Sequence, residues 1–140
     1  MTETGPFCRD KLIRFHHCDP AGIVFYPQYF ILFNELVEDW FRDALGMDFA
    51  QLHMEHRLGV PMAKLECEFL SPSKIGEILH LRLTVQRIGG TSIAVLVEGG
   101  AEGAVRIRAN LVLVLASLDT IKSVPIPPWL RERLERFLAA

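Results

Sequence analysis

The chain has 140 residues, half of them hydrophobic, and this composition excludes general disorder. Its 15 Lys and Arg residues against 17 Asp and Glu residues leave a formal net charge of −2. That balance excludes the basic field with which proteins hold nucleic acids or anionic membranes. The length fits one domain, which we expect to span residues 1–140.

The cysteines and the N-terminus indicate the compartment. Three cysteines without a C-x-x-C pair predict neither a disulfide framework nor a zinc ribbon, so a reducing cytoplasm fits best. The polar first six residues lack the basic and apolar regions of a signal peptide. No apolar run reaches the length of a membrane span, so no membrane partner is expected.

The first half of the chain predicts one strand and two helices. Residues 11–16 resemble a short strand, and apolar residues at three- and four-residue spacing predict an amphipathic helix over 28–45. Pro27 suits the first helical position, and Gly46 suits the residue just past the end. Asp48 and Gln51 form the pattern of a capping box, which predicts a short second helix.

The second half predicts an antiparallel sheet. Four runs alternate between apolar and polar residues, over 63–69, 79–86, 92–98 and 105–116, with tight turns at Gly89–Gly90 and Gly99–Gly100. A last helix is expected over 128–139. The long helix must bury its apolar stripe on the sheet, which predicts an α+β fold.

Two of these strands indicate an oligomer. Residues 93–97 and 111–115 are apolar on both faces, whereas one helix covers only one face of a sheet. The other face, or an exposed strand edge, then needs a partner, and a second copy of the chain is the usual one. We therefore expect a homo-oligomer.

The most unusual segment leads into the long helix. Asp19-Pro-Ala-Gly22 is an ideal type I turn, and that structural role alone explains Asp19. A turn that feeds a helix, however, also sets unpaired backbone N–H groups and the positive end of the helix dipole beside the Asp19 carboxylate. Such groups stabilise a developing oxyanion, so a catalytic role for Asp19 stands beside the structural one.

Asp19-Pro-Ala-Gly-Ile-Val-Phe-Tyr-Pro-Gln-Tyr29, followed by a long helix, resembles the signature of the 4-hydroxybenzoyl-CoA thioesterase family. Gly59-Val-Pro61 and the strand lengths agree with it, and the resemblance covers nearly the whole chain. It implies a hotdog fold, in which a five-stranded antiparallel sheet wraps a long central helix. It implies hydrolysis of an acyl-CoA to a carboxylic acid and CoA, without a metal or another cofactor.

The resemblance also assigns site residues. Asp19 matches the catalytic carboxylate, as nucleophile or general base, and the Tyr26 backbone N–H matches the group that polarises the thioester carbonyl. Tyr29 and Pro61 match positions near the acyl pocket. The family's basic cluster for the CoA phosphates falls on Gly89-Gly90-Thr91, which carries no charge. We therefore expect CoA to lie across a subunit boundary, with its phosphates met by Arg87, Arg106 or Arg108.

Several alternatives remain open at this stage. Glu35, on the helix, is the second choice for the catalytic carboxylate, although a solvated helix face explains it as well. His53 and His56 are too few ligands for a metal site. The donor is acyl-CoA or an acyl carrier protein, and the acyl group is aromatic or short. A dehydratase of the same fold also stays open, although its Pro-Gly-His motif is absent, and a non-catalytic acyl-CoA binder would use Asp19 as a turn residue only.

Overall fold

The long helix is present in the computed structural model, which describes residues 4–139. It is α1 (Pro27–Asp43), with Pro27 at its start. The helix ends at Asp43, two residues before the predicted end, and Gly46 follows three residues later with φ 70°, the left-handed conformation that glycine adopts without strain. Seven of its residues are buried: Tyr29, Leu32, Phe33, Leu36, Val37, Trp40 and Phe41.

The predicted capping box starts the second helix, α2 (Phe49–Met54). The Gln51 backbone N–H donates to Asp48 Oδ1 at 2.7 Å, and the Asp48 N–H donates to Gln51 Oε1 at 3.2 Å. Local sequence therefore determines this helix start, as expected.

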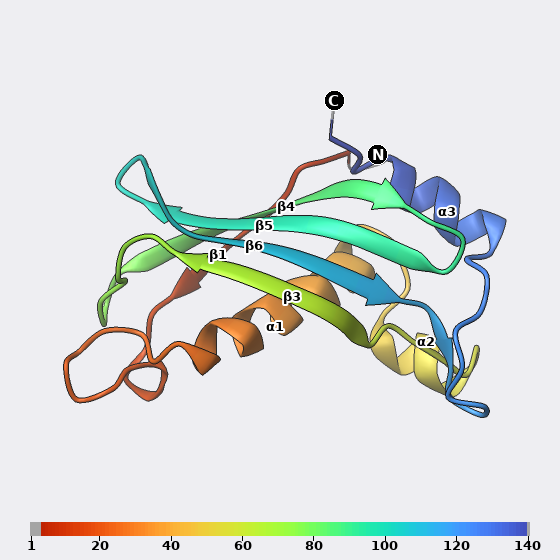
Figure 1. The fold of residues 1–140 in the computed structure, drawn as a ribbon, viewed down its shortest axis with the longest axis horizontal. Helices are drawn as coiled ribbons and strands as arrows, with labels where there is room; N and C mark the ends of the chain where they lie inside the picture. The colour runs from red at the N-terminus through yellow and green to blue at the C-terminus, as the bar shows by residue number, and fades with distance from the viewer. Residues whose placement is uncertain (1–3, 140) are drawn as a thin grey trace.

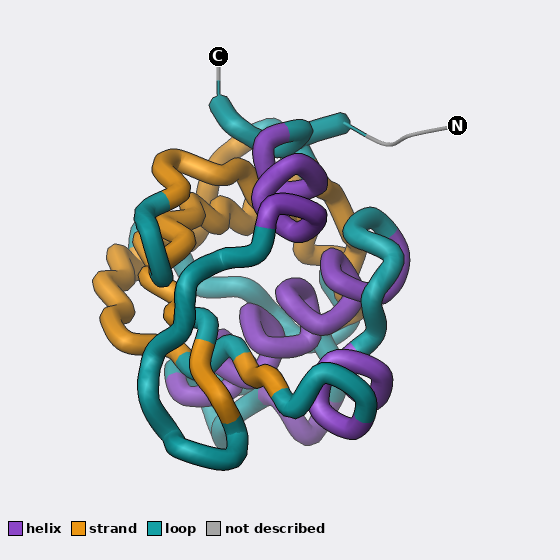
Figure 2. The backbone as a smooth tube through the Cα atoms, turned by 90° about the vertical axis from the view of Figure 1, so that its right-hand side faces the viewer, coloured by secondary structure: helices purple, strands orange, loops and turns teal. Residues whose placement is uncertain are grey.

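The sheet wraps α1. Its five antiparallel strands lie in the order β1 (Phe7–Leu12), β4 (Ile78–Ile88), β5 (Ser92–Ala101), β6 (Ala104–Val114) and β3 (Met62–Phe69). Figure 1 shows α1 running beneath these strands, and Figure 2 shows the curved sheet on one side of the helices. The predicted α+β hotdog fold is thus confirmed.

Short elements complete the fold. A 3-10 helix, η1 (Phe15–His17), follows β1, and β2 (Leu58–Gly59) pairs with β7 (Ala116–Ser117) in a small second sheet. The last helix, α3 (Pro128–Glu135), packs near β4. Within residues 4–139, no helix combines the length and hydropathy that a membrane crossing requires.

The strand expected over 11–16 is wrong in position. β1 lies earlier, over Phe7–Leu12, and residues 15–17 form η1. β1 is an edge strand in which only Phe7 is buried, so its sequence alternates weakly. His17 ends the extended run, because its Nδ1 accepts the Arg14 N–H at 2.9 Å and closes a helical turn.

Two further boundaries are corrected. Gly99–Gly100 lies inside β5, and the hairpin turns at Glu102–Gly103, whose φ angles are both positive. A Cβ on Gly99 would lie 2.9 Å from the Ile107 side chain and 3.0 Å from that of Leu81, so packing explains this glycine. The last helix ends at Glu135, because the chain then turns to pair Leu138 with Val85.

Candidate active site

The Asp19 turn forms as predicted. The Gly22 N–H donates to the Asp19 carbonyl at 2.9 Å, and the Ala21 N–H donates to Asp19 Oδ1 at 2.9 Å. This second bond is an Asx turn, so the side chain holds its own loop. Asp19 is half-buried, and Oδ2 accepts no hydrogen bond from residues 4–139. One carboxylate oxygen thus shapes the turn while the other is unoccupied.

The turn is fastened to the start of α1. Cys18 and Val24 form an isolated antiparallel bridge, and the Phe25 N–H donates to the His17 carbonyl at 2.9 Å. Asp19 and Tyr26 therefore belong to one small backbone unit.

Tyr26 is the N-cap residue of α1, with helical φ and ψ angles of −52° and −37°. Its carbonyl accepts the Tyr29 N–H at 3.1 Å, but within the described chain its own N–H has no acceptor. This N–H is one of the unpaired donors at the start of a helix, where the dipole is positive. It can therefore donate to a ligand oxygen.

An aromatic pocket of about 380 Å³ lies beside Tyr26. The Phe69 ring, at the end of β3, packs edge-on against Tyr26 at 6.2 Å and lies 6.0 Å from Tyr29. Tyr29 is only 4% exposed. The predicted residues Tyr26 and Tyr29 are thus brought together in one pocket, which is lined by Ile23, Val24, Tyr26, Tyr29, Phe69, Leu70, Ser71 and Pro72.

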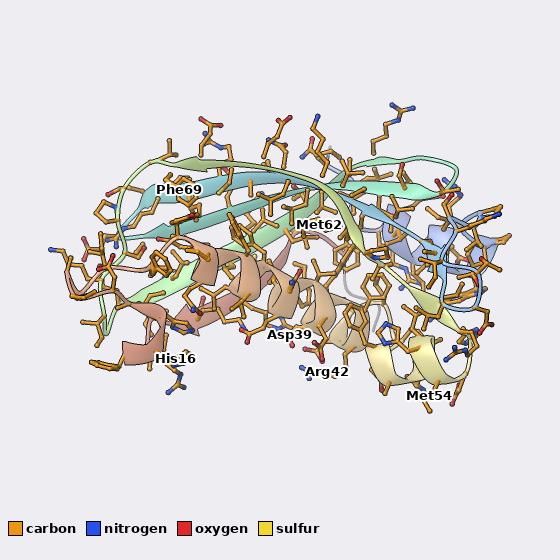
Figure 3. The ribbon with its side chains drawn as sticks, turned by 60° about the horizontal axis from the view of Figure 1, so that its bottom comes forward. His16, Asp39, Arg42, Met54, Met62 and Phe69 are labelled. Atoms are coloured by element: carbon orange, nitrogen blue, oxygen red, sulfur yellow. The ribbon has the colours of Figure 1, made fainter. Side chains whose placement is uncertain are left out.

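Pro61 does not lie in this pocket of its own chain. Pro61 directly precedes Met62, the first residue of β3, whereas the pocket lies at Phe69, the last residue of β3. Figure 3 shows Met62 and Phe69 at opposite ends of the strand. At about 3.3 Å per residue, the eight steps from Pro61 to Phe69 span roughly 26 Å.

The three predicted arginines are also separated. Arg87 pairs with Ala94 near the Met62 end of the sheet, and its exposed side chain forms no ion pair within residues 4–139. Arg106 and Arg108 lie toward the Phe69 end and bind carboxylates. Arg106 Nη1 is 2.8 Å from Glu77 Oε1, and Arg108 Nε is 3.0 Å from Glu98 Oε2.

The alternative carboxylate, Glu35, faces a different depression. It is half exposed and accepts a bond from Lys11 Nζ at 3.2 Å. Its depression, of about 250 Å³, also contains His16 and His17, whereas the aromatic pocket beside Tyr26 contains none of these residues. Burial lowers the pKa of His17, which fits a neutral ring whose Nδ1 accepts a hydrogen bond.

Other potentially reactive groups are accounted for by the structure. Burial, and then the Asp19 charge, raise the pKa of the Cys18 thiol, which argues against a thiolate nucleophile. No group of three or more His, Cys, Asp and Glu residues suited to a metal occurs in residues 4–139.

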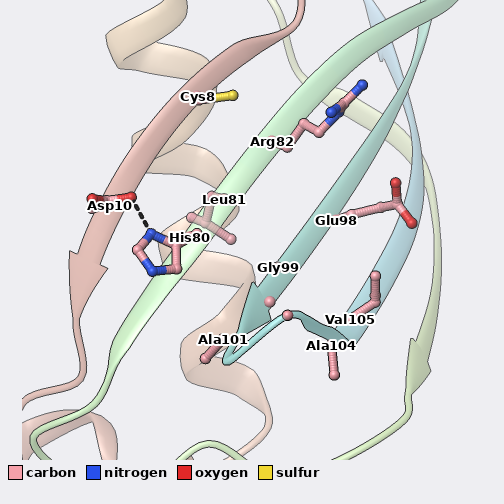
Figure 4. Close-up of a pocket in the computed structure, with 12 residues that line it drawn as sticks. Cys8, Asp10, His80, Leu81, Arg82, Glu98, Gly99, Ala101, Ala104 and Val105 are labelled. Atoms are coloured by element: carbon pink, nitrogen blue, oxygen red, sulfur yellow. Dashed lines mark hydrogen bonds and ion pairs between the residues drawn. The ribbon is translucent and has the colours of Figure 1, made fainter.

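A further hollow, of about 490 Å³, lies elsewhere, on the face of the sheet away from α1 (Figure 4). Its polar residues include His80 and Asp10, which are joined at 2.6 Å. None of the predicted site residues lines this hollow.

Sequence reasoning missed the contribution of residues 69–72. Phe69 is the last residue of the strand predicted over 63–69, and Leu70–Pro72 follow it. The end of that strand is therefore the only sequence signal near this wall of the pocket. The place of residues 69–72 beside α1 depends on the long-range pairing of β3 with β6.

A long helix wrapped by a five-stranded antiparallel sheet is the hotdog fold, and this chain adds to it a carboxylate turn and a free amide at the helix start. Residues 13–134 match the thioesterase-like superfamily, and the chain belongs to this family. The predicted family and the class of thioester hydrolase are thereby confirmed.

Relatives and solved structures match this chain along nearly its full length. The chain is 25% identical over 130 residues to 1,4-dihydroxy-2-naphthoyl-CoA hydrolase of Thermosynechococcus vestitus, which covers 89% of this chain and 88% of the relative. A thioesterase superfamily structure from Jannaschia sp. CCS1 has a TM-score of 0.88 and 26% identity, over 100% and 99% of the two chains. A 1,4-dihydroxy-2-naphthoyl-CoA thioesterase from Synechocystis has a TM-score of 0.83 and 21% identity, over 93% and 96%.

Proposed function

We propose that this thioesterase hydrolyses an acyl-CoA to a carboxylic acid and CoA, with Asp19 and the Tyr26 backbone N–H as its catalytic groups. The observation that carries the proposal is the unpaired Tyr26 N–H at the start of α1, joined to the Asp19 turn through two backbone pairings and flanked by the aromatic pocket.

The proposed reaction starts with the thioester carbonyl oxygen accepting the Tyr26 N–H. As the carbonyl carbon becomes tetrahedral, negative charge develops on this oxygen, and the N–H and helix dipole stabilise it. Asp19 either attacks the carbonyl carbon, forming a mixed anhydride that water then opens, or deprotonates the attacking water. In both routes the C–S bond breaks, and CoA leaves as a thiol after protonation.

The acyl group is proposed to occupy the aromatic pocket. Tyr26, Tyr29 and Phe69 line it, and the Phe69 ring packs against the other two at centroid separations of 6.2 and 6.0 Å. This aromatic wall suits an aromatic or short acyl group. Relatives that act on 1,4-dihydroxy-2-naphthoyl-CoA support an aromatic acyl group.

A homodimer would complete this site. Tyr26 and Tyr29 lie at the Phe69 end of β3, whereas Pro61 and Arg87 lie at the Met62 end. β3 is an edge strand, and pairing it with β3 of a second copy across a two-fold axis is antiparallel. Such pairing brings the Met62 end of one chain to the Phe69 end of the other, and both predicted groups then meet in one site.

Charge supports this pairing. Lys64, Glu66 and Glu68 occupy alternate exposed positions of β3, and within the chain Lys64 Nζ lies 2.9 Å from Glu66 Oε1. An antiparallel register centred on Leu65 sets the lysine of each copy opposite Glu66 of the other and allows the same pairing between the chains. In that dimer Arg87 and Arg108 are the accessible candidates for the CoA phosphates. Arg106 is the least accessible of the three, with a side chain 11% exposed.

Three free cysteines support a reducing cytoplasm as the location of the protein.

The proposal is tested by thiol release from a panel of acyl-CoAs and from the matching acyl carrier protein thioesters, using wild type and Asp19→Asn. Asn retains the Oδ1 acceptor for the Ala21 N–H, so the turn and thermal stability should be preserved. We expect kcat to fall ~10²-fold or more with little change in KM, because the carboxylate acts in the transition state.

The alternatives give different results. A non-catalytic binder would show saturable acyl-CoA affinity without thiol release, and a carrier-protein enzyme would prefer the second donor. Near-normal turnover by a stable Asp19→Asn variant would contradict the role of Asp19 and favour Glu35.

A further inference from the structure

The loop between β3 and β4, residues 70–77, supports the proposed site from two sides. The Val24 N–H donates to the Ser73 carbonyl at 3.0 Å, and the Ile75 N–H donates to the Gly22 carbonyl at 3.1 Å. Ile23 and Lys74 form an antiparallel bridge between these bonds. Residues 70–72 of the same loop line the aromatic pocket. Displacement of this loop would therefore move both the Asp19 turn and the pocket wall.

Arg106 fastens the beginning of this loop. It is the extra residue of a β-bulge, because Gly99 pairs with Ile107 whereas Gly100 pairs with Val105. Bulges redirect side chains, and that of Arg106 reaches the loop. Its carbonyl accepts the N–H groups of residues 70 and 71 at 2.9 and 3.0 Å, and its Nη1 lies 3.4 Å from the Pro72 carbonyl.

Glu77 fastens the end of the loop to the same guanidinium. Its Oε1 accepts Arg106 Nη1 at 2.8 Å and the Lys74 N–H at 2.6 Å. The bond to Arg106 holds the pKa of Glu77 below its ordinary value, and the same bond raises the pKa of Arg106, to which the nearby Tyr29 also contributes. The pair is ionised at neutral pH and joins the two ends of the loop.

We propose that Arg106 and Glu77 are a positioning pair, which holds the 70–77 loop against the Asp19 turn and thereby sets the shape of the acyl pocket and its choice of acyl group. This inference rests on the proposed acyl-CoA thioesterase function. Neither residue is assigned contact with the reacting atoms.

The size of the expected effect follows from the burial of the pair. The Arg106 side chain is 11% exposed and that of Glu77 25%, so removal of Arg106 leaves a poorly solvated carboxylate. Removal of Glu77 leaves Arg106 only the more distant and exposed Glu102, at 3.8 Å, and either change frees the loop to move. A misplacement of about 1 Å in a reacting group can cost ~10²-fold in rate. The effect should differ between acyl groups, because a bulky ring contacts the loop wall more closely than a short chain.

The test compares Arg106→Met and Glu77→Gln with a matched control, Arg9→Met. Arg9 also forms a partly buried arginine–carboxylate pair, at 3.1 Å to Asp43, but joins β1 to α1 away from this loop. The readout is the ratio of kcat/KM for benzoyl-CoA to that for butyryl-CoA. Partial unfolding lowers both rates equally, so a merely structural residue does not change this ratio.

We expect the ratio to change ~10-fold or more in Arg106→Met and Glu77→Gln, to change no further in the double variant, and to stay constant in Arg9→Met. Hydrogen exchange gives a second readout that needs no activity. The Val24 and Ile75 amides should exchange at least ~10-fold faster in the two loop variants and at the wild-type rate in Arg9→Met.

The two proposals fail in different ways. If wild type releases no thiol from any donor, the proposed function is wrong, whereas the exchange of the two amides still tests the positioning pair. If wild type is active but both the ratio and the exchange stay unchanged in Arg106→Met, the positioning role is wrong and the proposed function stands.

Discussion

At the scale of single residues, the turn-forming and catalytic interpretations of Asp19 are compatible. Oδ1 holds the loop through the Ala21 N–H, and this bond fixes the direction of the whole carboxylate. Rigid support of this kind is what a catalytic group needs, because positioning contributes much of the rate. A hydrogen bond to one oxygen is therefore no argument against chemistry at the other.

The Tyr26 amide gives a prediction that separates backbone from side chain. Tyr26→Pro removes the N–H and tolerates the φ angle of −52°, whereas Tyr26→Ala keeps the N–H and removes the ring. We expect kcat to fall ~10²- to 10³-fold in the proline variant, the usual loss for one oxyanion donor, and less than ~10-fold in the alanine variant. Steady-state thiol release, with thermal unfolding of both variants, measures this. Equal losses of kcat in the two stable variants would contradict the role of the amide.

At the scale of elements, sequence predicted most where the signal is local. α1, its Pro27 start, the Gly46 turn after it and the Asp48–Gln51 capping box follow from contacts within four residues or from helical spacing. β1 could not be placed, because an edge strand with one buried residue carries little alternation. The Gly99–Gly100 pair predicts a turn from local sequence. Gly99 is instead required by close packing against β4 and β6, whose residues are distant in sequence.

The C-terminal end of α1 gives a prediction about pH. A hydrogen bond from Arg42, assisted by Arg9, lowers the pKa of Asp43 from 3.8 to about 2. Because the folded-state pKa is the lower one, the stability that the ionised carboxylate contributes is complete above the ordinary pKa and is lost as pH falls through about 2. Asp43→Asn should therefore be less stable than wild type near neutral pH, and this difference should shrink between about pH 4 and 2.

Urea unfolding at a series of pH values measures this difference. Glu132→Gln on α3 is the control, because Glu132 is exposed and has no ion pair within residues 4–139. Its difference from wild type should stay nearly constant over the same range. A pH-independent difference for Asp43→Asn would show that its ion pairs contribute nothing to stability.

At the scale of the whole molecule, the sequence could name candidate site residues but not their grouping. The Asp19–Tyr29 segment is contiguous, so its members were predicted together. Tyr26 and Tyr29 line one pocket, and Asp19, which does not line it, is joined to Tyr26 through the backbone pairings of residues 17–25. Pro61 and Arg87 come from segments whose positions depend on sheet pairing, and they lie at the other end of the chain's own sheet. A loop such as 70–77 has no sequence signature, because its role arises from contacts with Gly22 and Arg106.

The homodimer gives a prediction that compares the two sheet edges. Along a strand, successive backbone N–H groups point alternately to its two neighbouring sides. The Leu70 N–H donates to the Arg106 carbonyl and the Ile13 N–H to the Glu77 carbonyl, so both point into the sheet. The N–H groups of Cys67 on β3 and Cys8 on β1 therefore point to the free edges. Proline at either position spares the chain's own ladder but removes a donor from the edge. We expect Cys67→Pro to become monomeric and lose activity, because β3 no longer pairs with its copy. Cys8→Pro, on β1, should stay dimeric and active.

Sedimentation velocity at micromolar concentration, followed by thiol release, checks both variants. A monomeric wild type, or dissociation through Cys8→Pro alone, would contradict pairing at β3 and separate Pro61 and Arg87 from the site.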